Sequence, residues 1–429
     1  MATSYGYATK LTMLYERWRK ISSERRNETA LRDFAAGRRW TFGELFAAGE
    51  MAKAGPAATI FPQGHAPEFI CDLLAAWREN RITCPLEPQQ SPPASAPPEN
   101  CVHLKSTSAT GGPARWVAFT AEQLAADAEN IVATMGLRPD WPNLGVISLA
   151  HSYGFSNLVL PLLLHGVPLI LVQAPLPEMI RLAAAGETAI TLAAVPAMWR
   201  AWHQAGAIPP NTRLAISAGA PLPLNLEQAV FAETGLKIHN FLGSSECGGI
   251  AYDASEMPRA DAALVGSPMR NVHLSVGEDG CLVIRSGAVG STYWPEKSPA
   301  LGGGIFQTSD LAELTAGQIF LRGRRGDQIN VAGRKISPET IERALLANPK
   351  VRECLVFGAP SRDAGRTETI VAVLVADAPA AELKHSLLAR LPAWQVPRHW
   401  QFVEALQSNA RGKVSRTEWR RRWLMESGR

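Results

Sequence analysis

The feature that most constrains the fold is an alternation of short apolar runs and helical patterns between residues 145 and 243. Such alternation favours βαβ units, in which a helix connects each strand to a parallel neighbour. Helices are expected between strands at 145–150, 166–173, 190–195, 214–219 and 236–243. This part of the chain is therefore predicted to be α/β, with mainly parallel, doubly wound sheets.

The sequence on the C-terminal side predicts two further parts. After about residue 265 the pattern changes to short β runs and glycines, which indicates a β-rich subdomain. Helical and strand patterns then follow one another in a small α+β unit, whose first helix is expected to be capped by Ser337. We therefore expect a large N-terminal domain (1–325) and a small C-terminal domain (326–429) joined by a hinge.

Composition argues against several classes of protein. The 43 basic and 39 acidic residues are spread along the chain and leave a formal net charge of only +4, which gives no case for nucleic acid as a partner. The six cysteines form no CxxC pair, so neither a disulfide framework nor a zinc site is expected. No apolar run approaches the ~18 residues of a membrane span. A soluble protein of the reducing cytoplasm is expected.

Three polar motifs are candidates for a ligand site. The segment STSATGGPAR (106–115), called the hydroxyl-rich loop below, combines donors and glycines as an anion-binding nest does, but it lacks the lysine of a P-loop. GSSE ends a predicted strand with Glu246, where a carboxylate can bind Mg²⁺. TSD places Asp310 where it can accept both hydroxyls of a ribose. Alone, each motif is equally compatible with an ordinary polar turn.

Three further features lie near the predicted domain boundary or a strand end. The glycines of GRRGDQINVAGRKISPETIE (323–342) can absorb the rotation of a hinge, or belong to a plain linker. Lys413 lies in a turn after a strand and can bring a positive charge to an anion, although a solvated lysine is the ordinary alternative. His151 follows a predicted strand and can line a pocket mouth or simply belong to a loop.

In this order, the motifs resemble those of the adenylate-forming superfamily, which includes acyl-CoA synthetases, luciferases and the adenylation domains of peptide synthetases. The resemblance extends from GRRWTFGEL (37–45) to the end of the chain, and its collinearity makes it far more specific than any one motif. It implies an acyl-CoA synthetase type of enzyme, with ATP, Mg²⁺ and coenzyme A as cofactors. The region before the hydroxyl-rich loop is shorter than is usual in that superfamily.

The resemblance assigns the principal roles to four residues. Glu246 is implied as the Mg²⁺ ligand, Asp310 as the ribose ligand and Lys413 as the lysine that contacts both the carboxylate and the α-phosphate. His151 falls at the aromatic-or-histidine position near the acyl pocket.

Further residues match other positions of the family's motifs. In the hydroxyl-rich loop, Ser108 replaces a glycine and Ala114 replaces the lysine, with Arg115 one place later. Leu242, beside Phe241, replaces the tyrosine that normally stacks on adenine. Implied contacts to phosphate, adenine, the acyl group or the thioester step come from Ser106, Thr107, Thr110, Gly111, Ala218, Gly219, Ala220, Ser245, Arg324, Gly333 and Lys335, with Gly326 at the hinge.

The reaction that the resemblance implies has two halves. ATP converts a carboxylate into an acyl-adenylate and pyrophosphate, and the C-terminal domain then rotates about Gly326 so that the Gly333 loop replaces Lys413. The expected thiol acceptor is coenzyme A, and an acyl carrier protein is the alternative. The segment after His151 lacks the aspartate with which amino-acid-activating members bind an amine, so a non-amino carboxylic acid, aryl or aliphatic, is favoured.

Two other functions stay open at this point. A non-catalytic nucleotide- or acyl-binding relative would explain the replaced family residues, although a binding remnant has little use for Lys413. An α/β hydrolase is suggested by AISAG (215–219), with Ser217 as nucleophile, but prolines after it delay the helix that a nucleophile elbow needs. A homodimer is compatible with the sequence, which fixes neither the oligomeric state nor the acid.

Overall fold

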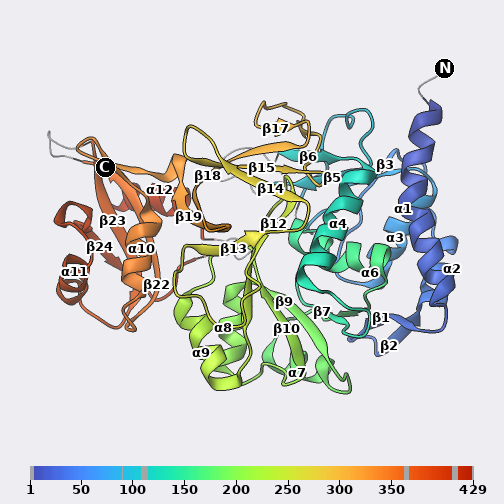
Figure 1. Cartoon of the computed structure of the whole chain (residues 1–429), viewed down its shortest axis with the longest axis horizontal. Coiled ribbons are helices and arrows are strands. Elements are labelled where there is room, and N and C mark those ends of the chain that lie inside the picture. The colour runs from blue at the N-terminus through green and yellow to red at the C-terminus, as the bar shows by residue number, and fades with distance from the viewer. Residues whose placement is uncertain (1–3, 89, 108–114, 362–366, 408–413, 428–429) are drawn as a thin grey trace.

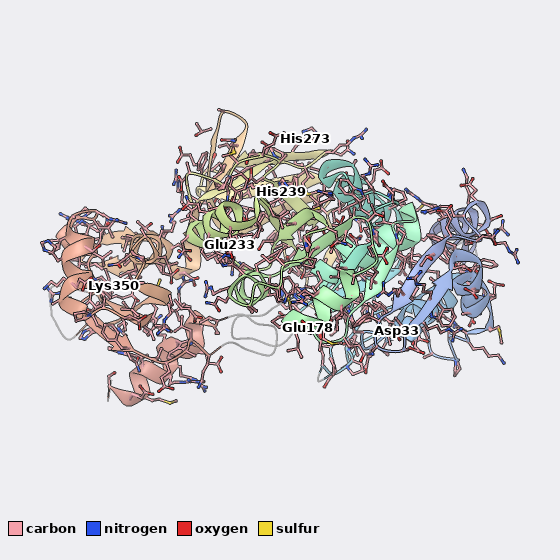
Figure 2. All side chains as sticks on the ribbon, turned by 90° about the horizontal axis from the view of Figure 1, so that it is seen from below. Asp33, Glu178, Glu233, His239, His273 and Lys350 are labelled. Carbon is pink, nitrogen blue, oxygen red and sulfur yellow. The ribbon has the colours of Figure 1, made fainter. Side chains whose placement is uncertain are left out.

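The computed structural model describes residues 4–88, 90–107, 115–361, 367–407 and 414–427, with side chains from Thr12 onward. Figure 1 shows the C-terminal elements at one end of the molecule and the N-terminal helices at the other. In the view turned by 90°, Lys350 and Asp33 mark these two ends (Figure 2). No helix in the described ranges is long and apolar enough to cross a bilayer.

A 14-stranded sheet runs through the large N-terminal part. The prediction of a parallel α/β region is confirmed, because adjacent strands in the middle of this sheet pair in parallel. In spatial order they are β11 (Ile238–Ser244), β10 (Thr212–Ser217), β9 (Ile190–Ala194), β7 (Asn143–Gly145), β8 (Leu169–Leu171) and β1 (Thr29–Asp33), with β2 (Arg38–Thr41) antiparallel at the edge.

The strand predicted at 145–150 is largely wrong in its bounds. β7 begins two residues earlier, at Asn143, and ends at Gly145, after which the chain bends towards a helix. Leu158 and Leu169 both approach Gly145 so closely that a Cβ there would lie 3.4 and 2.8 Å from their side chains. Apolar residues beyond Gly145 are therefore buried by the covering helix rather than by strand pairing.

Helices cover the sheet as the βαβ pattern predicts (Figure 1). The helix predicted after β7 is present in three consecutive pieces, because Pro161 has no N–H to give to the carbonyl of Asn157. That carbonyl accepts a hydrogen bond from Asn143 Nδ2 at 3.2 Å instead. The helices are α4 (Ala121–Met135), α5 (Ser152–Gly154), the π-helix η1 (Phe155–Val159), α6 (Leu160–His165), α7 (Pro177–Ala184), α8 (Pro196–Gln204) and α9 (Leu224–Thr234).

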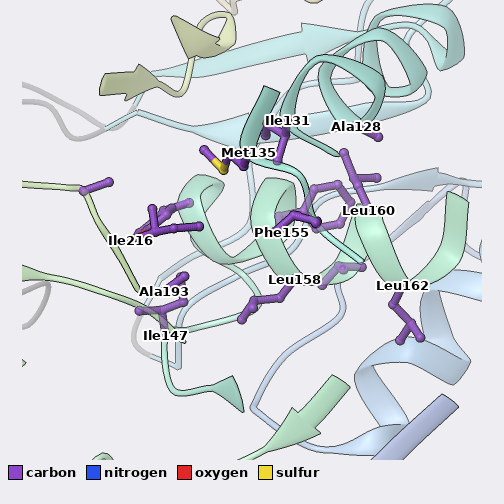
Figure 3. Close-up of a cluster of buried hydrophobic side chains, with 14 of the residues drawn as sticks. Ala128, Ile131, Met135, Ile147, Phe155, Leu158, Leu160, Leu162, Ala193 and Ile216 are labelled. Carbon is purple, nitrogen blue, oxygen red and sulfur yellow. The ribbon is translucent and has the colours of Figure 1, made fainter. Parts of the chain in front are cut away.

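The largest hydrophobic core lies between these helices and the sheet. Figure 3 shows side chains of η1 and α6 among those of α4 and the strand region; labelled are Ala128, Ile131, Met135, Ile147, Phe155, Leu158, Leu160, Leu162, Ala193 and Ile216. Burial of this apolar surface is the main favourable contribution to folding.

Three N-terminal helices, for which the sequence gave no prediction, extend the same core. Trp18 and Phe42 are fully buried, with ring centroids 5.9 Å apart. Thr41 caps the second helix and forms a capping box with Glu44. The helices are α1 (Ser4–Glu24), α2 (Phe42–Met51) and α3 (Pro67–Arg78).

A second sheet carries the hydroxyl-rich loop. Its loop-bearing strands, β5 (His103–Ser106) and β6 (Trp116–Phe119), pair antiparallel with Ser106 opposite Trp116. The other strands are β16 (Thr292–Trp294), which pairs with β6, and β4 (Ile82–Thr83) and β3 (Thr59–Ile60) on the other side.

The predicted β-rich subdomain is confirmed as the antiparallel half of the large sheet. It begins with β12 after the Glu246 turn and ends with the β18–β19 hairpin. Its strands are β12 (Gly248–Tyr252), β13 (Leu264–Pro268), β14 (Val272–Val276), β15 (Cys281–Ser286), β17 (Leu301–Gly302), β18 (Ile305–Thr315) and β19 (Gln318–Arg324).

The C-terminal part is α+β and has hydrophobic clusters of its own. Ser337 occupies the N-cap position of α10 but forms no side-chain capping bond. Its hydroxyl lies against Gly323 instead, where a Cβ would come within 2.6 Å of it. The elements are the hairpin β20 (Ile329–Val331) and β21 (Arg334–Ile336), α10 (Pro338–Leu346), β22 (Val351–Pro360), β23 (Glu368–Ala376), α11 (Ala380–Leu388), β24 (His399–Phe402) and α12 (Arg416–Glu426).

Candidate active site

The hydroxyl-rich loop is closed at its base by two hydrogen bonds. The backbone N–H and the side-chain Oγ1 of Thr107 both donate to the carbonyl of Arg115, at 2.8 and 3.1 Å. Ser106 is half-buried at the end of β5. Because the Thr107 hydroxyl is used within the protein, its proton is not directed at a ligand in this conformation. Thr110 and Gly111, together with Ser108 and Ala114, lie outside the described residues.

Glu246 lies in the tight turn between β11 and β12. Its N–H donates to Ser244 Oγ at 3.2 Å, and its carbonyl accepts from the N–H of Gly290 at 2.8 Å. One carboxylate oxygen, Oε1, accepts a hydrogen bond from the hydroxyl of Tyr293 at 3.0 Å. The carboxylate of Glu246 and the neighbouring Ser245 are half-buried.

Tyr293 links this turn to the second sheet and was missed by the sequence reasoning. It lies on β16, opposite Val117 of β6, and is 8% exposed. Burial, and then the negative charge of Glu246, raises the pKa of the Tyr293 hydroxyl, so it stays protonated and donates. The strand that follows the hydroxyl-rich loop is thereby joined to the Glu246 carboxylate.

Arg115 stacks on the same tyrosine. Its guanidinium carbon lies 4.0 Å from the centroid of the Tyr293 ring, within the range of a cation–π interaction. Its Nε is buried and has no hydrogen-bond partner. Arg115, Tyr293 and Glu246 therefore form a chain of contacts beside the base of the hydroxyl-rich loop.

The carboxyl ends of β10 and β11 place further predicted residues at one edge of the sheet, the edge where open α/β sheets bind ligands. Ala218 is buried and donates to the carbonyl of Ala194 at 3.2 Å. Gly219 has a φ of +84°, which carries the chain out of the sheet, and Gly219 and Ala220 are exposed. Leu242 is half-buried on β11.

Phe241 and His151 meet around a buried tyrosine. Phe241 is 6% exposed, and its ring centroid lies 5.9 Å from that of Tyr153. His151 is half-buried, and its Nδ1 accepts from the N–H of Tyr153 at 3.3 Å. Phe241 is thus part of the core, which leaves Leu242 as the more accessible of the two residues suggested beside adenine.

Ser217 does not have the setting of a hydrolase nucleophile. It is fully buried, and its Oγ has no hydrogen-bond partner among the residues that the structure describes. The next helix, α9, begins only at Leu224. A nucleophile elbow needs a sharp turn from strand directly into helix and a partner histidine.

Asp310 and Arg324 lie opposite each other on β18 and β19. Arg324 Nε donates to Asp310 Oδ1 at 2.9 Å, and the N–H of Asp310 donates to Thr308 Oγ1 at 3.0 Å. Burial opposes the charge of Arg324, but the Asp310 carboxylate outweighs it and raises the arginine pKa. Asp310 stays partly exposed, so its other oxygen is accessible from solvent.

The hinge and thioester-loop candidates follow directly. Gly326 lies in the short 3₁₀ helix η2 (Arg325–Asp327), and a Cβ there would meet nothing within 4 Å. Gly333, with a φ of +80°, turns the exposed β20–β21 hairpin, and its N–H donates to Asn330 Oδ1 at 2.9 Å. Lys335 is exposed on β21.

Lys413 lies outside the described residues, but the start of the helix after it is firmly anchored. Arg416 donates to Asp327 Oδ2 and to Glu342 Oε1, each at 2.8 Å. These ion pairs connect the start of α12 to the hinge segment and to α10.

Comparison with protein families matches two parts of the chain. Residues 66–294 match the model of the AMP-binding enzyme family, and residues 340–413 match that of the AMP-binding enzyme C-terminal domain. The first match alone covers more than half of the 429 residues.

The sequence is also similar to curated proteins. It is 29% identical over 252 residues to an uncharacterised acyl-CoA ligase of Bacillus subtilis, a match that spans 56% of this chain and 52% of that protein. It is 27% identical over 401 residues to a feruloyl-CoA synthase of Amycolatopsis, spanning 87% and 80%. A 2-succinylbenzoate–CoA ligase of Staphylococcus aureus is 26% identical over 330 residues, spanning 75% and 67%.

Solved structures share the fold. ATP-bound MatB from Rhodopseudomonas palustris superposes with a TM-score of 0.84 at 19% identity, over 95% of this chain and 99% of that one. The o-succinylbenzoate CoA synthetase MenE from Bacillus subtilis, with its acyl-adenylate intermediate, gives 0.81 at 20% identity, over 94% and 97%. The chain therefore belongs to the AMP-binding enzyme family, with the fold of the adenylate-forming superfamily and similarity to its acyl-CoA synthetases.

Proposed function

We propose that the protein is an AMP-forming acid–thiol ligase that activates a non-amino carboxylic acid as its acyl-adenylate and transfers the acyl group to coenzyme A. The observation that carries the proposal is the position of Glu246 beside the base of the hydroxyl-rich loop, bonded at 3.0 Å to Tyr293 of the adjoining strand. The names of the curated relatives, which include feruloyl-CoA synthase and 2-succinylbenzoate–CoA ligase, support the acceptor.

The chemistry asks the protein for positioning and charge neutralisation. A carboxylate is a poor electrophile, and ATP turns it into a mixed anhydride with AMP as the activating group. The enzyme has to hold the carboxylate in line with the α-phosphorus while negative charge moves onto pyrophosphate. In this proposal Lys413 contacts the carboxylate and the α-phosphate, and Asp310 accepts hydrogen bonds from the ribose.

Glu246 fits a shared Mg²⁺ site rather than a closed one. No group of three or more His, Cys, Asp or Glu side chains that could hold a metal is present among the described residues. Mg²⁺ is usually bound by one or two carboxylates and by substrate phosphates, so a single carboxylate at this position suffices. The ion would neutralise phosphate charge there.

The domain boundary and the hinge remain part of the proposal. The largest core cluster ends at Ile319, and the first cluster of the C-terminal part begins at Ile329, which supports separate bodies on either side of Gly326. Rotation there would replace the Lys413 segment by the Gly333 hairpin for the thioester step. The absence of an acidic side chain from residues 152–165 favours a non-amino acid substrate.

Pyrophosphate release with ATP, Mg²⁺ and a panel of aryl, short-chain and long-chain acids tests the proposal, without a thiol and then with coenzyme A. We expect release that depends on the acid and is stimulated by coenzyme A. Lys413→Ala should abolish it, whereas Lys384→Ala, which removes an exposed lysine of α11, should not.

Two results would contradict parts of the proposal. If ATP binds but no acid supports release, the protein is a nucleotide-binding relative without this activity. If release is stimulated by a phosphopantetheine-bearing carrier protein and not by coenzyme A, the acceptor is wrong and the adenylation half stands.

A further inference from the structure

A cation is missing from the hydroxyl-rich loop where related enzymes carry a lysine, because that position is Ala114. The next residue, Arg115, has its carbonyl fixed by the two hydrogen bonds from Thr107. Its side chain therefore starts from the anchored base of the loop rather than from the loop itself. A cation attached there needs little additional ordering to meet an anion.

The Arg115 guanidinium is held in place, yet its charge is not neutralised by the protein. Stacking on Tyr293 at 4.0 Å leaves the N–H groups in the plane of the guanidinium able to donate. Arg115 forms no ion pair with a carboxylate in the described part of the chain, and its buried Nε has no acceptor. A buried N–H without an acceptor is unfavourable, so this donor is better explained by a ligand than by folding.

Tyr293 fixes the distance between this cation and the proposed metal ligand. Its ring supports Arg115, and its hydroxyl donates to Glu246 Oε1 at 3.0 Å. Its neighbours Thr292 and Trp294 also pair with β6, so the backbone of β16 is fixed relative to the loop. One buried side chain thus orders a positive and a negative group side by side, which suits a metal-bound polyphosphate.

We propose that Arg115 binds the terminal phosphates of Mg–ATP in place of the missing loop lysine, and that Tyr293 is a positioning residue for both Arg115 and Glu246. The identity of the anion rests on the proposed function, since ATP and its product pyrophosphate are the polyphosphates of that reaction. The competing explanation is that Arg115 only packs on Tyr293, a contact worth ~0.5–1 kcal/mol at an exposed site.

Binding of ATP and of AMP, measured by calorimetry with Mg²⁺ and without acid, separates these explanations because AMP lacks the terminal phosphates. We expect Arg115→Gln to weaken ATP binding about 10- to 100-fold, the range for losing a charge-assisted hydrogen bond. AMP binding should change less than about twofold. Adding Ala114→Lys to Arg115→Gln should restore most of the ATP affinity.

Two further variants make the test specific. Tyr293→Phe keeps the ring under Arg115 but removes the bond to Glu246, so it should raise the Mg²⁺ concentration needed for ATP binding and leave AMP binding unchanged. Arg38→Gln is the matched control, because it removes a guanidinium stacked at 3.5 Å on Trp40 at the sheet edge. It should change neither affinity.

The outcomes separate this inference from the proposed function. If the wild-type protein binds ATP and Arg115→Gln binds it equally well, or loses ATP and AMP affinity together, the role of Arg115 is wrong and the ligase proposal stands. If the wild-type protein binds neither nucleotide, the proposed function fails and this inference fails with it. Competition by pyrophosphate but not by inorganic phosphate would show that Arg115 recognises a polyphosphate.

Discussion

Two cations flank the hydroxyl-rich loop, and they differ in how much of their charge the protein itself uses. Lys105, on the strand that enters the loop, is almost completely buried and donates to Asp127 Oδ2 at 3.2 Å and to Ser156 Oγ at 3.0 Å. It also lies 4.8 Å from the centre of the Phe119 ring. Arg115, on the strand that leaves the loop, has a ring partner and no carboxylate partner in the described residues.

The partners of Lys105 explain its role. Asp127 of α4 also accepts from Ser156 Oγ at 2.6 Å and from the N–H of Gly249 at 3.2 Å. One buried ion pair thus joins β5, α4, η1 and β12, the last of which follows Glu246. A fully satisfied charge of this kind supports the site's architecture, whereas the unsatisfied donor of Arg115 is available to a ligand.

The largest expected effect comes from breaking the satisfied side of this comparison. Lys105→Met leaves Asp127 buried without its cation and should lower the free energy of unfolding by about 3–5 kcal/mol. Urea denaturation measures this. Lys105→Met combined with Asp127→Leu should recover most of the loss, since no charge is then left unpaired. A loss below about 1 kcal/mol in the single variant would show that Lys105 is not a structural cation.

The unsatisfied side should respond in the opposite way. Arg115→Gln should lower the rate of acid-dependent pyrophosphate formation by ~10²–10³, the usual cost of one charge-matched contact in a transition state. Its free energy of unfolding should stay within about 0.5 kcal/mol of wild type, as for surface substitutions. Stopped assays and urea denaturation on one preparation check both. A large stability loss with unchanged rate would reverse the assignment of the two cations.

A third cation, Arg17, tests whether a partner can be neutral. Its Nη2 lies 3.0 Å from His165 Nε2, and burial, then the charge of Arg17, lowers the pKa of His165 to about 4, although Glu129 opposes the shift. The unfolded chain binds a proton near pH 6.5 that the folded chain does not, so stability should fall as the pH drops from 6.5 towards 4. The loss should reach about 1–3 kcal/mol.

Denaturation series at several pH values measure this effect, with His165→Gln as the comparison. The variant should show a flatter dependence between pH 6.5 and 4 because its side chain does not titrate. An identical slope in both proteins would mean that His165 keeps an ordinary pKa.

The smallest effect is expected at the exposed pair of Arg324 and Asp310. The two side chains are 54% and 25% exposed, so solvent screens their attraction. Arg324→Gln should change the free energy of unfolding by less than about 1 kcal/mol. Chemical denaturation at low and high salt checks this, and a loss comparable to that of Lys105→Met would contradict the dependence on burial.

Much of the fold could be predicted from local patterns. β9 was predicted at 190–195 and is found at Ile190–Ala194, because a fully buried parallel strand reads as a continuous apolar run. The strand expected at 145–150 was misplaced because those apolar residues are buried by a helix. The helix α2 was missed, although Thr41 and Glu44 carry the spacing of a capping box.

The site could be predicted only where the chemistry is local. Glu246 and Asp310 stand out because each ends a short polar motif. Tyr293 reaches Glu246 across 47 residues, and no local pattern signals that contact. Lys105 did offer a signal that was overlooked, since a lysine within the predominantly apolar strand HLKS indicates a buried partner.

The measurement that tests the account most directly is acid-dependent exchange of labelled pyrophosphate into ATP, which reports the adenylation half-reaction without any thiol. The account predicts exchange with at least one carboxylic acid, its loss in Lys413→Ala, and a ~10²–10³-fold reduction in Arg115→Gln. Exchange that needs no acid, or no exchange with any acid in a protein that binds ATP, would contradict it.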